Sequence, residues 1–290
     1  MSSAEVAGSV RPALSQAELA ERIRPRTISE VLDGAFGLYR QGFAQVSLAQ
    51  LIFAIPVIVL CVLAPIGAGF WAVLISPSQR AMSYHVGMDR LLARERSMGQ
   101  LLGAGVRAWP GMVLLAILQV VVSAVLAGLA FVPFGLPGVL LSMNGAETIG
   151  VVLIALGALL GVAVALAASG YLYLVDAVFL FERDWNALMR SFRLVRGGFW
   201  KVALTAIVAY FIVMGPAAVL QVAILVQSGG FDESFQAATP EAWHGIAAVL
   251  IGVLLTPFAA HVCTLLWVDR RAVREGMDLA PESPDEAQDR

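Results

Sequence analysis

Five long stretches of this chain contain no Asp, Glu, Lys or Arg. They are residues 41–79, 108–146, 148–175, 202–231 and 242–268. A helix needs about 20 apolar residues to cross the hydrocarbon core of a bilayer, so each stretch is long enough for at least one crossing. The composition agrees, because 59% of the 290 residues are hydrophobic and only 14% are charged, against about 25% charged in globular domains. We therefore expect an all-α fold, a polytopic membrane helix bundle.

The positions of Lys and Arg decide how often the first stretch crosses. These residues cluster at 11–40, 90–107, 183–201 and 270–274, and the basic residues of short loops stay on the cytoplasmic side. A single crossing by 41–79 would place the second cluster outside, whereas two crossings return it to the inside. We therefore predict six transmembrane helices with both termini cytoplasmic. The spans are expected at 44–64, 66–89, 110–132, 148–175, 202–226 and 245–268.

Each predicted pair of spans is preceded by a segment that has helical periodicity but is too polar to cross. In the first segment, the spacing of Thr27 and Glu30 predicts a capping box at the helix start. Its apolar residues recur as in an amphipathic, interfacial helix, and the same stripe recurs from Met98 and from Ala187. The stripe consists of Ile28, Val31, Leu32, Ala35, Phe36, Tyr39 and Phe43.

This recurrence predicts a three-fold internal repeat of surface helix plus membrane hairpin, over residues 28–92, 97–175 and 184–268. The alternative is that juxtamembrane helices share this periodicity without any repeat. In either case the chain has a single membrane domain, 28–274. Residues 1–27 are polar without the apolar core of a signal peptide, and we expect a disordered cytoplasmic N-terminus there. Residues 275–290 are acidic and predict a disordered cytoplasmic tail.

The third amphipathic segment is the most basic. Arg190, Arg193, Arg196 and Lys201 lie opposite its apolar stripe, as in helices that rest at the headgroup boundary. These four residues are candidate contacts to anionic lipid headgroups, each contributing about 1 kcal/mol. A simpler interpretation is that these residues only orient the helix and hold it at the lipid surface, without a specific binding site.

Four ionisable side chains that lie inside the predicted spans or next to the end of one form a candidate intramembrane polar site. They are Arg80, His85, Asp176 and His261. Because a charge at the bilayer centre costs about 2.5–3.5 kcal/mol on insertion scales, such groups usually face a partner or a cavity. Two interpretations of an Arg80–Asp176 ion pair stay open. The pair forms part of a functional site, or it only neutralises two charges within the fold. Arg80 could also snorkel to the inner surface, and His261 could be a hydrogen-bonded core residue.

Small residues also form a pattern in the fourth predicted span. Gly150, Gly157 and Gly161 lie on one helix face, which permits a close helix–helix contact. Packing within the bundle is the first interpretation and oligomerisation the second. Prolines interrupt several apolar stretches, and discontinuous helices are one way in which transporters build midplane sites.

Three stretches resemble the membrane domain found fused to some bacterial glycerophosphoryl diester phosphodiesterases, and its free-standing relatives. They are RPRTISEVLDGAFGLYRQGF (24–43), NALMRSFRLVRGGFWKV (186–202) and LLWVDRRAVREGMDL (265–279). The chain departs from the family pattern at Met189, where a second basic residue is usual, and by one extra residue between Arg271 and Arg274. The resemblance implies a multi-pass protein of the bacterial plasma (inner) membrane with an accessory role near lipid or envelope metabolism.

No catalytic pattern is visible in the sequence. The three histidines lack metal-ligand spacing, and no Gly-x-Ser-x-Gly, Walker or HExxH pattern occurs. The soluble phosphodiesterase domain of the resembling enzymes has no counterpart here. We therefore expect a protein that is not an enzyme and needs no cofactor or metal. An intramembrane enzyme is the weakest hypothesis.

These observations favour a non-enzymatic integral plasma-membrane protein that acts as an accessory or scaffold protein in lipid or envelope processes. Its expected partners are membrane lipids, including anionic headgroups, and a protein at the cytoplasmic face, but no nucleic acid. The alternative is a small-molecule or lipid transporter that uses the kinked spans. A polar cavity in the bundle would favour the alternative.

Overall fold

The computed structural model describes residues 25–63, 65–227 and 242–275, and this part of the chain is helical with no strand. The all-α fold is therefore confirmed. The helices are α2 (Ile28–Leu63), α3 (Pro65–Leu91), α4 (Met98–Met143), α5 (Glu147–Leu172), α6 (Val175–Glu182), α7 (Ala187–Val195), α8 (Phe199–Gln227) and α10 (Ala242–Glu275). The predicted tails at 1–27 and 275–290 lie almost entirely outside the described residues, as does most of the outer loop expected after α8.

Several described helices are long and apolar enough to cross a membrane, so the chain is an integral membrane protein. They are the five stretches Ile28–Leu60, Met98–Met143, Glu147–Glu182, Phe199–Pro216 and Val249–Glu275. Helix α3 is not among these five. It forms as expected beside α2, but its second half carries Arg80, His85, Asp89 and Arg90. The sixth span and the three-fold repeat stay predictions.

The first two amphipathic segments are not separate helices. Residues 28–43 are the beginning of α2, and residues from 98 onward are the beginning of α4, with no break before the apolar part. The third segment does form a helix of its own, α7. It is cut off from α8 because Gly197 has a φ of +90°, a left-handed conformation that ends helices and suits glycine.

The segment 133–147, between the predicted third and fourth spans, is largely helical, which corrects the predicted end of the third span at residue 132. Helix α4 continues through Pro133 and Pro137 as far as Met143. Neighbouring helices allow proline inside membrane helices, and here α5 packs along this part of α4, where Gly135 and Gly138 are buried. Only residues 144–146 form the turn, with Gly145 at a φ of +85°.

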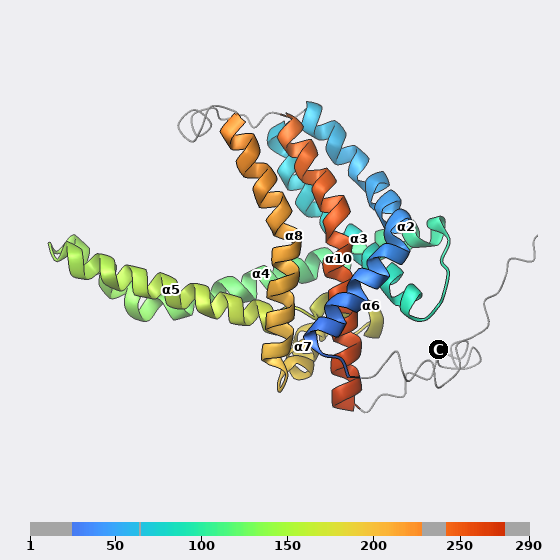
Figure 1. Cartoon of the computed structure of the whole chain (residues 1–290). Helices are drawn as coiled ribbons and strands as arrows, with labels where there is room; N and C mark the ends of the chain where they lie inside the picture. The colour runs from blue at the N-terminus through green and yellow to red at the C-terminus, as the bar shows by residue number, and fades with distance from the viewer. Residues whose placement is uncertain (1–24, 64, 228–241, 276–290) are drawn as a thin grey trace, which may run out of the picture.

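Helix α10 is the centre of the bundle. It contacts α2, α3, α6, α7 and α8, and every residue from 257 to 270 except Ala259 is buried. Helices α2, α3 and α8 surround it, while the hairpin of α4 and α5 extends sideways from this group (Figure 1). Side chains of α10 therefore lie among those of five other helices, and a site that combines several elements is expected around α10 or where the hairpin joins the bundle.

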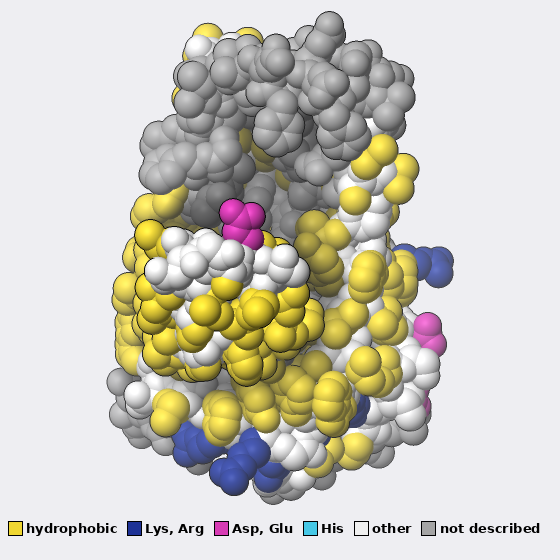
Figure 2. All heavy atoms as spheres, turned by 90° about the vertical axis from the view of Figure 1, so that its left-hand side faces the viewer, with side chains coloured by type: hydrophobic (Ala, Val, Ile, Leu, Met, Phe, Trp, Pro, Cys, Tyr) yellow, Lys and Arg dark blue, Asp and Glu magenta, His cyan; other side chains and the backbone are white. Residues whose placement is uncertain are grey.

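The hairpin of α4 and α5 is covered with exposed apolar side chains. Val120, Leu129, Leu159 and Leu166 are each more than 60% exposed. Figure 2 views the molecule from the side on which the hairpin extends, and it shows apolar side chains over much of the described surface, with a cluster of Lys and Arg below them. Such a surface exceeds what a water-soluble protein leaves uncovered, so it belongs in apolar surroundings such as lipid.

Candidate functional site

The structure places two of the four candidate intramembrane residues in direct contact. Arg80 of α3 donates from Nη1 to Oδ2 of Asp176 in α6, at 2.6 Å. The Asp176 side chain is only 5% exposed and that of Arg80 is 30% exposed. The chain is not helical between the end of α5 at Leu172 and the start of α6 at Val175, and α6, which carries Asp176, contacts α3.

A cavity of about 490 Å³ opens beside this ion pair, and we call it the junction cavity. It lies where the α4–α5 hairpin meets α3, α6 and α10. Its polar lining includes Arg80, Asp176, Gln119, Ser123 and Thr256. Oδ1 of Asp176 is buried and has no hydrogen-bond partner among the described residues.

The two histidines do not join this ion pair. His261 is buried on α10, facing Gly87 of α3, where an added Cβ would lie 2.6 Å from its Nδ1. Neither ring nitrogen of His261 has a hydrogen-bond partner in the described part of the chain. His85 lies near the ring of Phe181, 6.3 Å between centroids, and lines a different cavity. The four candidates therefore do not form a single site.

That second cavity, of about 690 Å³, is rich in arginine, and we call it the basic cavity. It lies between the end of α3, the start of α4 and the end of α6. Arg94, Arg96, Arg107 and Arg183 line it together with two carboxylates, Asp89 and Glu95, and with the indole of Trp185. The lining therefore has a surplus of two positive charges.

Only one of these four arginines is held in an ion pair with a lining carboxylate. Arg96 contacts Asp89, with its Nε 2.9 Å from Oδ2 and its Nη2 3.1 Å from Oδ1. Arg94, Arg107 and Arg183 are exposed and form no ion pair with any carboxylate that the structure describes. Arg107 donates to the carbonyl of Gly103 in its own helix, at 3.3 Å. Sequence reasoning missed this set because its members come from three separate segments, although the basic cluster at 90–107 pointed to most of it.

The candidate lipid contacts on the third amphipathic segment divide into two pairs. Arg190 binds Glu182, with its Nε 2.7 Å from Oε2, and also Glu275. Burial by itself would lower the pKa of the Arg190 guanidinium, but the hydrogen bonds and charges of Glu182 and Glu275 outweigh burial and raise it. Lys201 is likewise engaged within the protein, whereas Arg193 and Arg196 are exposed.

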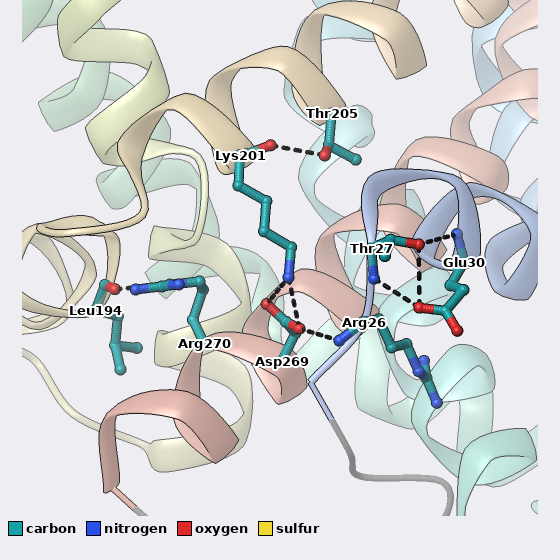
Figure 3. A network of polar contacts seen from close by, with 8 residues as sticks. All are labelled: Arg26, Thr27, Glu30, Leu194, Lys201, Thr205, Asp269 and Arg270. Atoms are coloured by element: carbon teal, nitrogen blue, oxygen red, sulfur yellow. Dashed lines mark hydrogen bonds and ion pairs between the residues drawn. The ribbon is translucent and has the colours of Figure 1, made fainter.

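Lys201 belongs to a polar network that joins the three stretches carrying the family resemblance (Figure 3). Its Nζ donates to both carboxylate oxygens of Asp269, each at 2.7 Å, and the side chain of Asp269 is 0% exposed. The backbone N–H of Arg26 donates to the same carboxylate, at 2.7 Å. Arg270 donates to the carbonyl of Leu194, at 3.1 Å. We call Arg26, Lys201, Asp269 and Arg270 the terminal clamp, because they hold the start of α2, the end of α7 and the start of α8 against the end of α10.

The start of α2 carries the capping box that the sequence predicted. The N–H of Thr27 donates to Glu30 Oε2 at 2.7 Å, and the N–H of Glu30 donates to Thr27 Oγ1 at 3.3 Å. The prediction is therefore confirmed. The box sets the direction of the chain into α2 and so positions the neighbouring Arg26 for its contact with Asp269.

Within residues 25–63, 65–227 and 242–275, no group of three or more His, Cys, Asp or Glu side chains is placed to hold a metal ion. The junction cavity and the basic cavity instead offer guanidinium donors, which suit anionic oxygen groups. Comparisons with family models, with curated proteins and with solved structures give no match.

Proposed function

We propose that this integral membrane protein is a non-enzymatic accessory protein of lipid or envelope processes that holds a phosphate-bearing anionic group in its basic cavity. The observation that carries the proposal is the convergence of Arg94, Arg107 and Arg183 on one cavity without carboxylate partners among the described residues. Arginine is the side chain best suited to phosphate, because its planar donors bind two oxygens at once.

The surroundings of the basic cavity fit a lipid headgroup. Trp185 lines the cavity and is 69% exposed, and tryptophan is enriched where membrane proteins meet the headgroup layer. The surplus of two positive charges favours an anionic occupant, and each basic group near an anionic leaflet contributes about 1 kcal/mol. A phospholipid such as phosphatidylglycerol and free phosphate both carry the required group.

The location of the protein is part of the proposal. The positive-inside rule would place the basic cavity on the cytoplasmic side, since Arg94, Arg107 and Arg183 lie between predicted spans. The resemblance to membrane domains of bacterial phosphodiesterases supports a bacterial plasma membrane. A cytoplasmic protein partner would then meet the same face.

Binding of headgroups can be measured by native mass spectrometry on the full chain in detergent. The probes are dioctanoyl phosphatidylglycerol, dioctanoyl phosphatidylcholine and inorganic phosphate. We expect the protein to prefer phosphatidylglycerol over phosphatidylcholine about tenfold, which corresponds to about 1.4 kcal/mol. The double variant Arg94→Gln, Arg107→Gln should abolish this preference, because it removes two of the three unpaired guanidinium groups.

The matched control is the double variant Arg40→Gln, Arg274→Gln, with one substitution on α2 and one on α10. It removes the same charge from exposed positions outside the cavity, and it should leave the preference within about twofold. Equal losses in the two variants would contradict a specific cavity and indicate adhesion through net charge. Binding of inorganic phosphate with the same dependence on Arg94 and Arg107 would identify free phosphate, and not lipid, as the occupant.

A further inference from the structure

The junction cavity has chemistry that the basic cavity lacks, and it shares no residue with it. In the junction cavity a buried carboxylate and a guanidinium are paired through one oxygen and one nitrogen only. Oδ1 of Asp176 is left without a donor, and Nε and Nη2 of Arg80 are left without an acceptor, in the part of the chain that the structure describes. A buried acceptor without a donor costs about 1–3 kcal/mol, so an occupant that supplies a donor there is favoured.

The charge balance restricts the occupant. Arg80 and Asp176 neutralise each other, and they are the charged residues that line the cavity. A ligand with a net charge would therefore place an uncompensated charge among apolar helices, which is costly. A net-neutral ligand with an anionic group for Arg80 and a cationic donor for Asp176 would satisfy both, since hydrogen bonds between ionised groups are about twice as strong as neutral ones.

The rest of the wall can hold such a ligand. Gln119 and Ser123 lie one turn apart on α4, and Thr256 faces them from α10. The side chains of these three residues form no hydrogen bond within the described residues, and each is partly exposed. The volume of about 490 Å³ is in the range of small-molecule sites, about 300–1,000 Å³.

The mouth of the cavity indicates that the occupant is attached to an apolar tail. Val120 lines the cavity and is 67% exposed. It continues into the exposed apolar surface of the α4–α5 hairpin, where acyl chains would lie. A lipid headgroup therefore fits the opening better than a free polar molecule.

We propose that the junction cavity binds the headgroup of a zwitterionic aminophospholipid, with Arg80 contacting its phosphate and Asp176 accepting a hydrogen bond from its primary ammonium. Phosphatidylethanolamine carries both groups. Phosphatidylcholine carries the same charges, but its trimethylammonium has no N–H to donate. This inference goes beyond the proposed function and depends on none of the residues of the basic cavity. It supplies the binding step that a lipid transporter would require.

The difference between these two lipids gives the test. The full chain in detergent is titrated with dioctanoyl phosphatidylethanolamine, dioctanoyl phosphatidylcholine and free phosphoethanolamine, and bound molecules are counted by native mass spectrometry. We expect about tenfold tighter binding of phosphatidylethanolamine than of phosphatidylcholine. Asp176→Asn should reduce this ratio to about one, because it replaces the charged acceptor for the ammonium with an amide.

A second variant tests the cavity without touching the ion pair. Ser123→Leu fills the cavity from α4 and should weaken binding of phosphatidylethanolamine at least about tenfold. The matched control is Ala124→Leu, at the next residue, which is exposed and does not line the cavity; it should bind like the unmodified protein. If Ser123→Leu does not fold, Thr256→Leu fills the same cavity from α10.

The outcomes are distinct. Equal binding of the two lipids by the unmodified protein, or binding of phosphatidylethanolamine that survives a filled cavity, overturns the proposal. Binding of phosphoethanolamine without binding of the lipid overturns the lipid source. The double variant Arg94→Gln, Arg107→Gln tests only the basic cavity, so its result does not affect the test of the junction cavity. The two proposals can therefore fail independently.

Discussion

Asp176 and Asp269, two of the buried aspartates that form ion pairs within the described residues, have opposite surroundings. Asp269 receives three hydrogen bonds, two from Lys201 and one from the backbone of Arg26, so both of its oxygens are satisfied. Asp176 receives one from Arg80 and keeps Oδ1 unpartnered among the described residues. A satisfied carboxylate stabilises the fold, whereas an incompletely satisfied one can still bind something.

Loss of the Asp269 carboxylate should destabilise the protein without affecting either lipid preference. Asp269→Ala leaves Lys201 unpaired and the N–H of Arg26 without its acceptor, and breaking a buried pair costs about 3–5 kcal/mol. Because Lys201 is partly exposed, we expect the lower end of this range. Thermal unfolding in detergent measures the effect.

The matched control for this variant is Asp33→Ala, which removes an exposed carboxylate from α2. It should change stability by no more than about 0.5 kcal/mol. Similar melting temperatures for the two variants would show that the terminal clamp contributes little.

The sequence indicates which charged residues are unusual more readily than it indicates their ion-pair partners. Arg80 and Asp176 were conspicuous because charge is scarce in apolar stretches, and the structure brings them together. The basic composition of their segment predicts Lys201 and Arg190 as lipid contacts, yet both bind carboxylates of other helices. Lys201 binds Asp269 of α10, and Arg190 binds Glu182 of α6. A local pattern cannot indicate a partner that is brought near only by folding.

At the scale of elements, the glycine stripe of α5 is what holds the hairpin together. A Cβ on Gly157 would lie 2.8 Å from the backbone nitrogen of Gly135, and one on Gly150 would lie 2.6 Å from the carbonyl oxygen of Gly138. The two helices therefore approach backbone to backbone, as small residues permit in membranes. The glycine stripe therefore lies inside the hairpin, which favours packing within the bundle over oligomerisation.

Replacing Gly157 with alanine should separate the two helices of the hairpin. The added methyl group meets backbone atoms that cannot rotate away, and overpacking costs about 1–3 kcal/mol. The measurement is the midpoint of thermal unfolding in detergent, combined with the yield of a disulfide engineered across the hairpin.

Gly128→Ala provides the control on the partner helix, because nothing lies within 4 Å of its Cβ position. It should leave the midpoint unchanged or raise it slightly, since alanine favours helix more than glycine does. A lower midpoint in the Gly128 variant than in the Gly157 variant would contradict the proposed packing.

At the scale of the whole molecule, the direction of the α4–α5 hairpin could not be predicted. Its helices follow from long apolar sequence, but in Figure 1 the hairpin extends away from the group of α2, α3, α8 and α10. Apolar residues cover the hairpin on most sides, so hydrophobicity alone does not select one face for burial. The junction cavity lies where the hairpin leaves this group of helices, and its lining comes from both.

The six-span topology predicts which loops face outward. With Cys61 and Cys263 replaced by alanine, we expect Asn144→Cys to react with a membrane-impermeant maleimide in intact cells, because the turn at 144–146 contains no basic residue. Arg94→Cys and Asp184→Cys should react only after the cells are permeabilised.

Reaction of Arg94→Cys in intact cells would contradict the topology, because it would mean that 41–79 crosses once. A shielded Asn144→Cys would instead indicate that the hairpin does not cross the bilayer. Each variant serves as the control for the others, since all use the same reagent and background.

The sequence by itself determined that the chain is a helical membrane protein, where most helices lie, and which sparse charges to examine. These conclusions depend on local quantities: the length of apolar runs, periodicity, and cap residues such as Thr27 and Glu30. Only the tertiary structure decided that Lys201 binds Asp269, that α4 continues through Pro133, and that Arg94 and Arg183 line the same cavity. Those outcomes depend on contacts between residues distant in the chain. In an apolar environment a charged or polar group needs a partner, and only folding determines which partner it binds.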